Sequence, residues 1–136
     1  MADYRHSIAK VLVTEGGYVN DPDDAGGETY KGISRNFWHN WVGWQFIDGA
    51  KYNPTWPKCL NAIPQLQVAV FEFYKENFWD KIGGDQIASQ TIADNLVDSA
   101  VNEGIKPAVK RAQGIVGLAQ TGVVSEELVT KLNSLI

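Results

Sequence analysis

A run of twenty residues near the start of the chain, EGGYVNDPDDAGGETYKGIS at positions 15–34, limits most strongly what the chain can fold into. It holds five carboxylates, five glycines and Pro22. Because glycine and proline disfavour helix and aspartate favours turns, regular helix is excluded between Tyr18 and Lys31. We expect a loop or a small hairpin there, directly after a first helix that ends at a glycine pair.

The remainder of the chain carries mostly helical patterns, with apolar side chains three or four residues apart. Asp3, Ser34 and Ser125 are candidate N-caps, and Pro64 and Pro107 suit the first position of a helix. The fold class that follows is all-α with a small hairpin or loop, in one domain, since 136 residues suffice for one core. The helices are expected at about 4–15, 34–44, 64–83, 91–102, 107–116 and 125–135, with residues 45–63 irregular.

Composition and charge exclude several classes of function. The net charge is −4 and no stretch concentrates Lys and Arg, so the chain lacks the basic surface that binds nucleic acid. No segment approaches the length of a membrane span, and the first residues lack the apolar run of a signal peptide. Cys59 is the single cysteine, and His6 and His39 lack a metal-ligand spacing, so we expect no metal and no cofactor.

Two binding-loop templates fail on residues 15–34. The GxxxxGK and GxGxxG spacings of phosphate-binding loops do not occur. Counted from Asp21, a calcium loop matches at Asp23 and Gly26, but Ala25 and Gly32 stand where ligands belong. The aspartates also fit a plain turn in which they only face water.

A pair of carboxylates has a catalytic interpretation. Glu15 is expected at the C-terminal end of the first helix, where the helix dipole favours the protonated carboxyl. Asp24 follows in a loop that can fold back over it. A neutral acid and a second, ionised carboxylate are what cleavage of a glycosidic bond requires. Glu28 and Lys31 are interpreted as part of a solvated turn.

The motifs of this region resemble those of the glycoside hydrolase family 108 N-acetylmuramidases, which are lysozyme-like peptidoglycan hydrolases. The order of Glu, Asp and Thr before Gly-Ile is also similar to the active-site segment of phage lysozymes. The motifs that carry the resemblance are EGGY at 15–18, NDP at 20–22, Asp24, GG at 26–27, Thr29, GI at 32–33, FWD at 78–80, GD at 84–85, Asp98, AVN at 100–102 and Gly104.

The resemblance implies a single lysozyme-like muramidase domain over residues 1–136, in which residues 105–136 resemble the family's C-terminal peptidoglycan-binding region. The segments at 113–117 and 120–123 lack the Asp-Gly turn expected of that region. We therefore interpret them as core helices of the same domain. The reaction implied is hydrolysis of the β-1,4 bond between N-acetylmuramic acid and N-acetylglucosamine by general acid catalysis.

The resemblance also assigns roles to residues of this sequence. Glu15 corresponds to the catalytic glutamate of the family. Asp24 and Thr29 correspond to residues that position water, although Asp21 and Asp23 compete with Asp24 for the same role. Further substrate contacts are expected from the loop and its neighbouring aromatic residues: Tyr18, Asn20, Asp21, Gly26, Gly27, Tyr30 and Trp56.

The expected partner is the glycan strand of peptidoglycan, bound by a monomer without membrane insertion. A bacterial or prophage-derived protein is expected, made in the cytoplasm and acting on the cell wall or periplasm after export through a holin or a secretion partner. A non-catalytic cell-wall-binding or secretion-helper protein with the same fold is the main alternative, because a fold does not guarantee activity. A calcium-binding structural module is a third.

Overall fold

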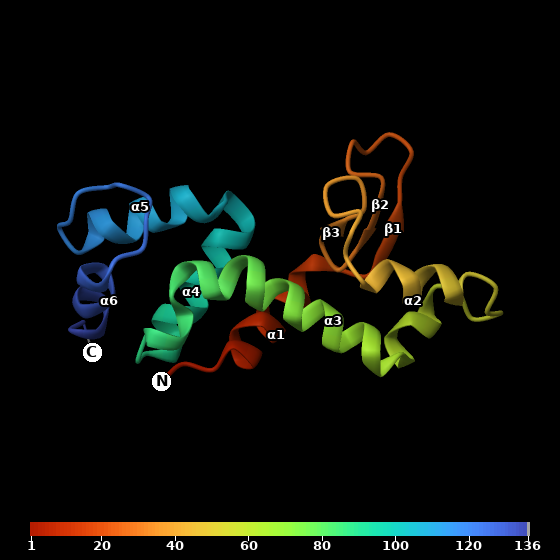
Figure 1. The fold of residues 1–136 in the computed structure, drawn as a ribbon, viewed down its shortest axis with the longest axis horizontal. Helices are drawn as coiled ribbons and strands as arrows, with labels where there is room; N and C mark the ends of the chain where they lie inside the picture. The colour runs from red at the N-terminus through yellow and green to blue at the C-terminus, as the bar shows by residue number, and fades with distance from the viewer. Residues whose placement is uncertain (136) are drawn as a thin grey trace. The chain divides into compact units, whose positions relative to one another are not determined.

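The computed structural model describes residues 1–135 (Figure 1). Over these residues the chain is mainly helical with one small sheet, which confirms the expected class and specifies the hairpin as three strands. None of the helices in this range is long and apolar enough to cross a membrane. The elements are α1 (Tyr4–Glu15), β1 (Tyr18–Asn20), β2 (Glu28–Tyr30), β3 (Ile33–Ser34), α2 (Gly43–Ala50), α3 (Pro64–Tyr74), α4 (Gln90–Glu103), α5 (Ile105–Ile115) and α6 (Glu126–Asn133).

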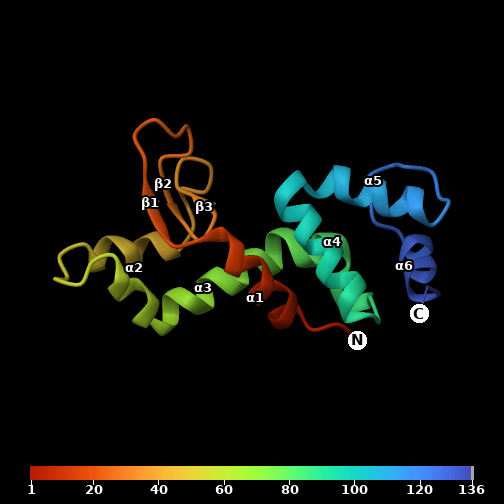
Figure 2. The same cartoon turned by 180° about the vertical axis from the view of Figure 1, so that it is seen from behind.

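The chain forms two compact units. One unit is Leu12–Phe73, which contains the sheet and α2, and the other combines Met1–Val11 with the chain from Tyr74 onward, which contains α4, α5 and α6. The domain predicted over residues 1–136 stays a prediction. Figures 1 and 2 show the strands next to the beginning of α2 within the first unit.

The sheet is antiparallel in the order β1-β2-β3, and its register decides which side chains share a face. Tyr18 lies opposite Tyr30, and Tyr30 lies opposite Ile33. Tyr30 and Ile33 are buried, so this face of the sheet is the core face, and Glu28 belongs to it because side chains alternate along a strand. Thr29 pairs with both Val19 and Ser34 on the opposite face.

The prediction of a helix from Ser34 through the tryptophans is wrong. Ser34 ends strand β3, and its hydroxyl donates to the carbonyl of Gly26 at 2.7 Å instead of capping a helix. Helix α2 begins only at Gly43 and continues to Ala50, into the segment 45–63 that we expected to be irregular, and it buries Trp44 and Ile47. The pairing of Ser34 with the hairpin overrides the helical spacing of the tryptophans, because local propensity is weaker than tertiary contacts.

The other helix predictions are confirmed to within a few residues. The helix predicted at 64–83 consists of α3, a π-helical segment at Lys75–Trp79 and a 3-10 helix at Asp80–Ile82. Asp3 accepts a hydrogen bond from the Arg5 amide at 3.0 Å, and Ser125 accepts one from the Leu128 amide at 3.2 Å, as N-caps do. Pro64 is the first residue of α3. The boundaries of α4 and α5 lie one or two residues from the predicted ones, within the usual uncertainty of helix ends.

In the unit of the terminal segments, α4 and α5 pack against each other. Gln113 on α5 is buried, and its side-chain oxygen accepts from the Gly122 amide at 2.9 Å while its amide nitrogen donates to the Val123 carbonyl at 3.0 Å. Gly122 has a positive φ of 78°. The side chain of Gln113 therefore holds the loop before α6 through two hydrogen bonds. This loop lacks the Asp-Gly turn expected of the family's C-terminal region.

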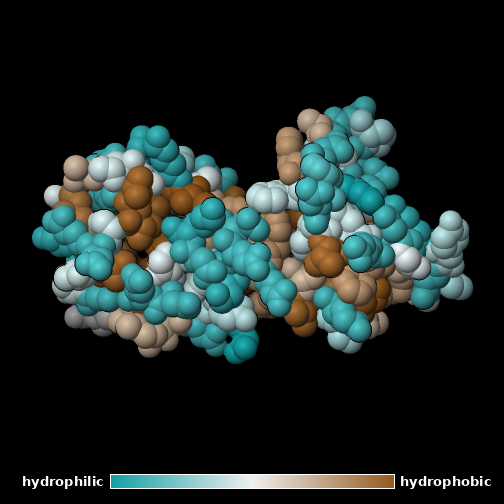
Figure 3. Space-filling view, in the orientation of Figure 1, coloured by the Kyte–Doolittle hydropathy of each residue, from teal (hydrophilic) through white to brown (hydrophobic). Residues whose placement is uncertain are grey.

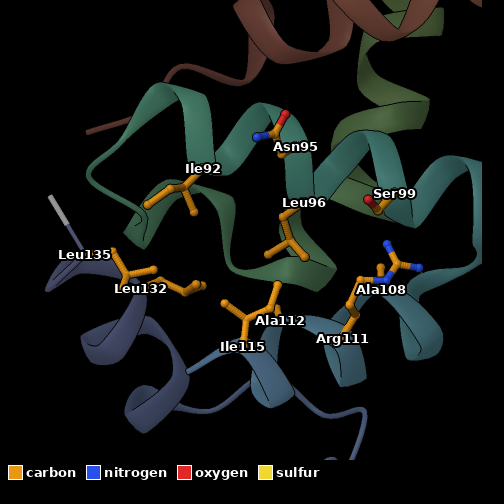
Figure 4. Close-up of a pocket in the computed structure, with 10 residues that line it drawn as sticks. All are labelled: Ile92, Asn95, Leu96, Ser99, Ala108, Arg111, Ala112, Ile115, Leu132 and Leu135. Carbon is orange, nitrogen blue, oxygen red and sulfur yellow. The ribbon is translucent and has the colours of Figure 1, made fainter. Parts of the chain in front are cut away.

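Helices α4, α5 and α6 line a largely apolar, open cavity of about 200 Å³ (Figure 4). Ile92 and Leu96 reach into it from α4, Ala112 from α5 and Leu132 from α6. The guanidinium of Arg111 lies at its edge and pairs with Glu103. None of the predicted site residues lines this cavity.

Asp94 on α4 is the buried carboxylate of this unit, with 8% of its surface exposed. Ser7 Oγ donates to it at 2.5 Å, Gln90 Nε2 at 2.8 Å and Lys10 Nζ at 2.9 Å, and His6 Nδ1 lies 3.4 Å away. Burial raises the pKa of Asp94, but the hydrogen bonds from Ser7, Gln90, Lys10 and His6 outweigh it and hold the pKa well below the usual range. Asp94 on α4 thus holds the first turns of α1 against its own helix.

Replacing Asp94 should destabilise the protein in a pH-dependent way. Asp94→Asn weakens hydrogen bonds to a charged acceptor, which typically contribute about 1–3 kcal/mol, or about 3–10 °C in Tm for a chain of this size. Since the folded-state pKa lies below that of the unfolded chain, the stabilisation is present above about pH 4 and lost as the pH falls further. Thermal unfolding of both proteins from pH 3 to 7 measures this.

The matched control is Asp98→Asn, on an exposed position of the same helix. Equal Tm differences for Asp94→Asn at pH 3 and pH 7 would contradict the assigned role.

Candidate active site

Glu15 is the last residue of α1 and is half-buried. Gly16 follows with a positive φ of 75°, which a residue with a Cβ adopts only under strain, and it redirects the chain into β1. The carbonyl of Gly17 accepts a hydrogen bond from the Lys31 amide at 3.1 Å. The backbone that follows Glu15 is therefore bonded to the turn between β2 and β3.

The loop between β1 and β2 is ordered by its own aspartates. Asp21 Oδ1 accepts from the Asp23 amide at 2.9 Å, and Asp24 Oδ1 accepts from the Gly26 amide at 2.9 Å. These are side-chain turns of the kind that aspartate commonly forms. All three aspartates remain exposed, and Figure 3 shows the hairpin, at the upper right, as mostly hydrophilic. The second oxygen of Asp24 is not used by this turn.

Close packing explains why positions 26 and 27 are glycine. A Cβ on Gly26 would lie 2.4 Å from Ser34 Oγ, and one on Gly27 would lie 2.8 Å from the Asn36 side-chain nitrogen. Gly27 also has a positive φ of 68°. The loop thus packs directly on the strand β3 and the residues after it. A sugar contact by either glycine stays a prediction.

Thr29 lies on β2, on the face of the sheet away from Tyr30. Its hydroxyl donates to the carbonyl of Gly27 at 3.2 Å, and the Gly27 amide donates to the carbonyl of Asp24 at 3.1 Å. The structure therefore brings Asp24, Gly27 and Thr29 together in one hydrogen-bonded corner of the hairpin.

Tyr18 and Trp56 form a ring pair at half-buried positions. Their ring centroids are 4.7 Å apart with an interplanar angle of 67°, which is an edge-to-face contact. Tyr30, by contrast, is 1% exposed and its hydroxyl accepts from Gln67 Nε2 at 2.9 Å. A ring that is buried in this way cannot stack on a sugar, so we assign Tyr30 to the core and remove it from the expected substrate contacts. Asn20 is exposed at the end of β1.

The interpretation of Glu28 and Lys31 as a solvated turn is wrong. The Glu28 side chain is only 16% exposed, and its two oxygens lie 3.0 Å from Arg35 Nη1 and 2.8 Å from Lys51 Nζ. Lys31 donates to Gln67 at 2.6 Å. Glu28 is buried because β2 is the central strand and the alternation of side chains places Glu28 on the same face as Tyr30. The signal in the sequence was the spacing of two residues between Glu28 and Tyr30.

Asp48 completes a charge network around Glu28. Arg35 makes a two-pronged contact with Asp48 at 2.7 and 2.8 Å, and Lys51 lies 3.1 Å from the same carboxylate. The hydrogen bond from Arg35 holds the pKa of Asp48 well below its ordinary value. We define Glu28, Arg35, Asp48 and Lys51 as the Glu28 network. Sequence reasoning missed Arg35, Asp48 and Lys51.

Within residues 1–135, no group of three or more His, Cys, Asp or Glu side chains is arranged to hold a metal ion. Cys59 is half-buried, and its thiol lies 3.9 Å from the Ala50 carbonyl. The absence of a metal requirement stays a prediction.

Comparison with known proteins identifies the class as glycoside hydrolase. The family model described as glycosyl hydrolase 108 matches residues 8–104, and the chain belongs to this family. The match includes most of α1, the hairpin and all of α4, whereas α5 and α6 lie beyond it.

The solved structure of SagA from Brucella abortus is similar to this chain, with a TM-score of 0.63 and 26% sequence identity. The similarity covers 98% of this chain and 70% of that one, so it includes α5 and α6. No curated protein matches the sequence.

The close packing of the loop predicts a specific steric effect. Gly26→Ala should destabilise the protein by about 1–3 kcal/mol, because the new methyl group overlaps Ser34 Oγ. The double variant Gly26→Ala, Ser34→Ala should recover part of this loss, since the overlapping oxygen is removed. Thermal or urea unfolding measures both.

Gly17→Ala is the control, because nothing lies within 4 Å of its Cβ position. If the double variant is less stable than the sum of the single changes predicts, the overlap is not the cause.

Proposed function

We propose that this glycoside hydrolase is an N-acetylmuramidase that cleaves the β-1,4 bond between N-acetylmuramic acid and N-acetylglucosamine in peptidoglycan. The observation that carries the proposal is the position of Glu15, half-buried at the end of α1 and directly before the hairpin, inside the segment that the family model matches. In this role Glu15 is the general acid that protonates the leaving glycosidic oxygen.

Asp24 is proposed as the second carboxylate and Thr29 as a residue that helps to position water. One observation supports Asp24 over its neighbours. It belongs to the corner that also holds Thr29, through the backbone of Gly27.

The proposed substrate contacts are on the hairpin and the nearby loop. Tyr18 and Trp56 offer half-buried aromatic rings, which suit the apolar face of a sugar. Asn20 and Asp21 are exposed polar groups that can hydrogen-bond sugar hydroxyls. Gly26 and Gly27 contribute backbone. Residues 105–136 are proposed to assist binding to peptidoglycan, next to the part matched by the family.

Membership in a family that acts on the cell wall supports a site of action in the bacterial periplasm or outside the cell. A holin or a secretion partner is proposed for export. The alternative function, non-catalytic wall binding with the same fold, is distinguished by zymography in a gel that contains peptidoglycan. Mass spectrometry of the digest then identifies the bond cleaved and the anomer released.

Glu15→Gln tests the catalytic acid. The amide keeps the shape of the side chain but has no proton to give, so the rate of wall lysis should fall by about 10²–10⁴-fold. Turbidity of a peptidoglycan suspension measures the rate, and circular dichroism verifies that the variant is folded. Glu72→Gln, an exposed change on α3, is the control. Lysis by the folded Glu15→Gln variant at the wild-type rate would remove Glu15 from the mechanism.

Asparagine substitutions compare the loop aspartates without breaking the loop, because an amide oxygen can accept the same hydrogen bonds from the Asp23 and Gly26 amides. Asp24→Asn should lower the rate of lysis at least about tenfold more than Asp21→Asn does. The assignment fails if Asp21→Asn is inactive while Asp24→Asn lyses normally.

A further inference from the structure

Tyr18 connects the proposed sugar-binding rings to the Glu28 network. Its ring contacts Trp56 edge to face, and its hydroxyl donates to Glu28 Oε2 at 2.5 Å. The tyrosine is on the first strand of the hairpin, whereas Trp56 lies in the segment between α2 and α3. The hydrogen bond to Glu28 therefore restrains a ring that contacts another part of the unit.

Glu28 itself has little freedom to move. Lys51 Nζ lies 2.8 Å from the oxygen that also binds Tyr18, and Arg35 Nη1 lies 3.0 Å from the other oxygen. Both cations are in turn held by Asp48. Arg35 also lies 5.1 Å from the ring centroid of Trp44, a buried residue of α2. The carboxylate is thus fixed from two sides by groups on other segments.

The protonation states agree with this geometry. Burial and the hydrogen bond to Glu28 raise the pKa of Tyr18 to about 12. Burial alone would raise the pKa of Glu28, but hydrogen bonds from Lys51 and Tyr18 and the charges of Lys51 and Arg35 lower it. Near neutral pH the phenol is the donor and the carboxylate the acceptor, which makes the bond charge-assisted.

The same contacts argue against a direct chemical role for Glu28. A general acid or base needs an oxygen within reach of the proton that it transfers. Both oxygens of Glu28 are already occupied, one by Arg35 and the other by Lys51 and Tyr18. Its function therefore has to act through Tyr18.

We propose that Glu28 is a positioning residue for substrate binding, which holds the Tyr18 ring against Trp56 so that the two form a preorganised surface for an N-acetylhexosamine ring of the glycan strand. The inference rests on the proposed function, because it assumes that the hairpin binds a glycan. Without the hydrogen bond, the tyrosine side chain would have to be immobilised when the sugar binds, which weakens binding by roughly three- to tenfold.

The test separates binding from catalysis. KM and kcat for solubilised peptidoglycan are measured for the wild type, Glu28→Gln, Tyr18→Ala and the double variant, with Glu72→Gln as the control. Glu28→Gln should raise KM about three- to tenfold and leave kcat within about twofold. In the Tyr18→Ala background the same change should leave KM unaltered, because the ring on which Glu28 acts is missing.

A second variant guards against loss of folding in Glu28→Gln. Tyr18→Phe removes the same hydrogen bond and keeps all the charges of the Glu28 network, so it should raise KM by a similar factor without lowering Tm by more than about 4 °C. Tyr52→Phe, at a fully exposed tyrosine, is its control.

The inference is overturned if Glu28→Gln raises KM equally with and without the Tyr18 ring, or if both Glu28→Gln and Tyr18→Phe bind as the wild type does. These results leave the muramidase proposal intact when the wild type is active. A wild type that binds no glycan and lyses no wall overturns the proposed function and this inference with it.

Discussion

The pairing of Glu28 with Arg35 and Lys51 is the interaction on which the hairpin depends. Three strands of two or three residues bury too little surface to be stable alone. The sheet is stabilised through its contacts with helices of the same unit, and the charge network links β2 to the C-terminal end of α2. A carboxylate that is 16% exposed is tolerated there because both of its oxygens are paired.

The acidic loop is organised differently, because two of its three aspartates accept a hydrogen bond within the turn that they begin. Asp21 and Asp24 satisfy amides two residues ahead, and Ser34 satisfies the carbonyl of Gly26. The loop is thereby ordered before any ligand arrives. This lowers the conformational entropy that the loop would otherwise lose when a sugar binds, and it gives Asp21 and Asp24 a structural reason to be there.

Much of the fold follows from the sequence, because helix ends are local events. Asp3, Pro64 and Ser125 act where a cap or a first-turn residue is expected, and periodicity then defines each helix. The failure at Ser34 depends on a tertiary contact, since its partner Gly26 lies in the loop between β1 and β2. For the candidate site, the motifs predict Glu15 and the loop, whereas Arg35, Asp48 and Lys51 carry no motif. Their role depends on ion pairs between segments that only folding brings together.

The two-pronged contact of Arg35 with Asp48 limits how this hairpin can be reused. Because the charges that compensate Glu28 reside partly on and after α2, residues 15–34 do not form a portable module. A graft of the loop into another scaffold would carry the acid without its counter-ions, and lysine in place of Arg35 would lack the planar fork. A transferable segment would therefore have to include the hairpin together with α2 and Lys51.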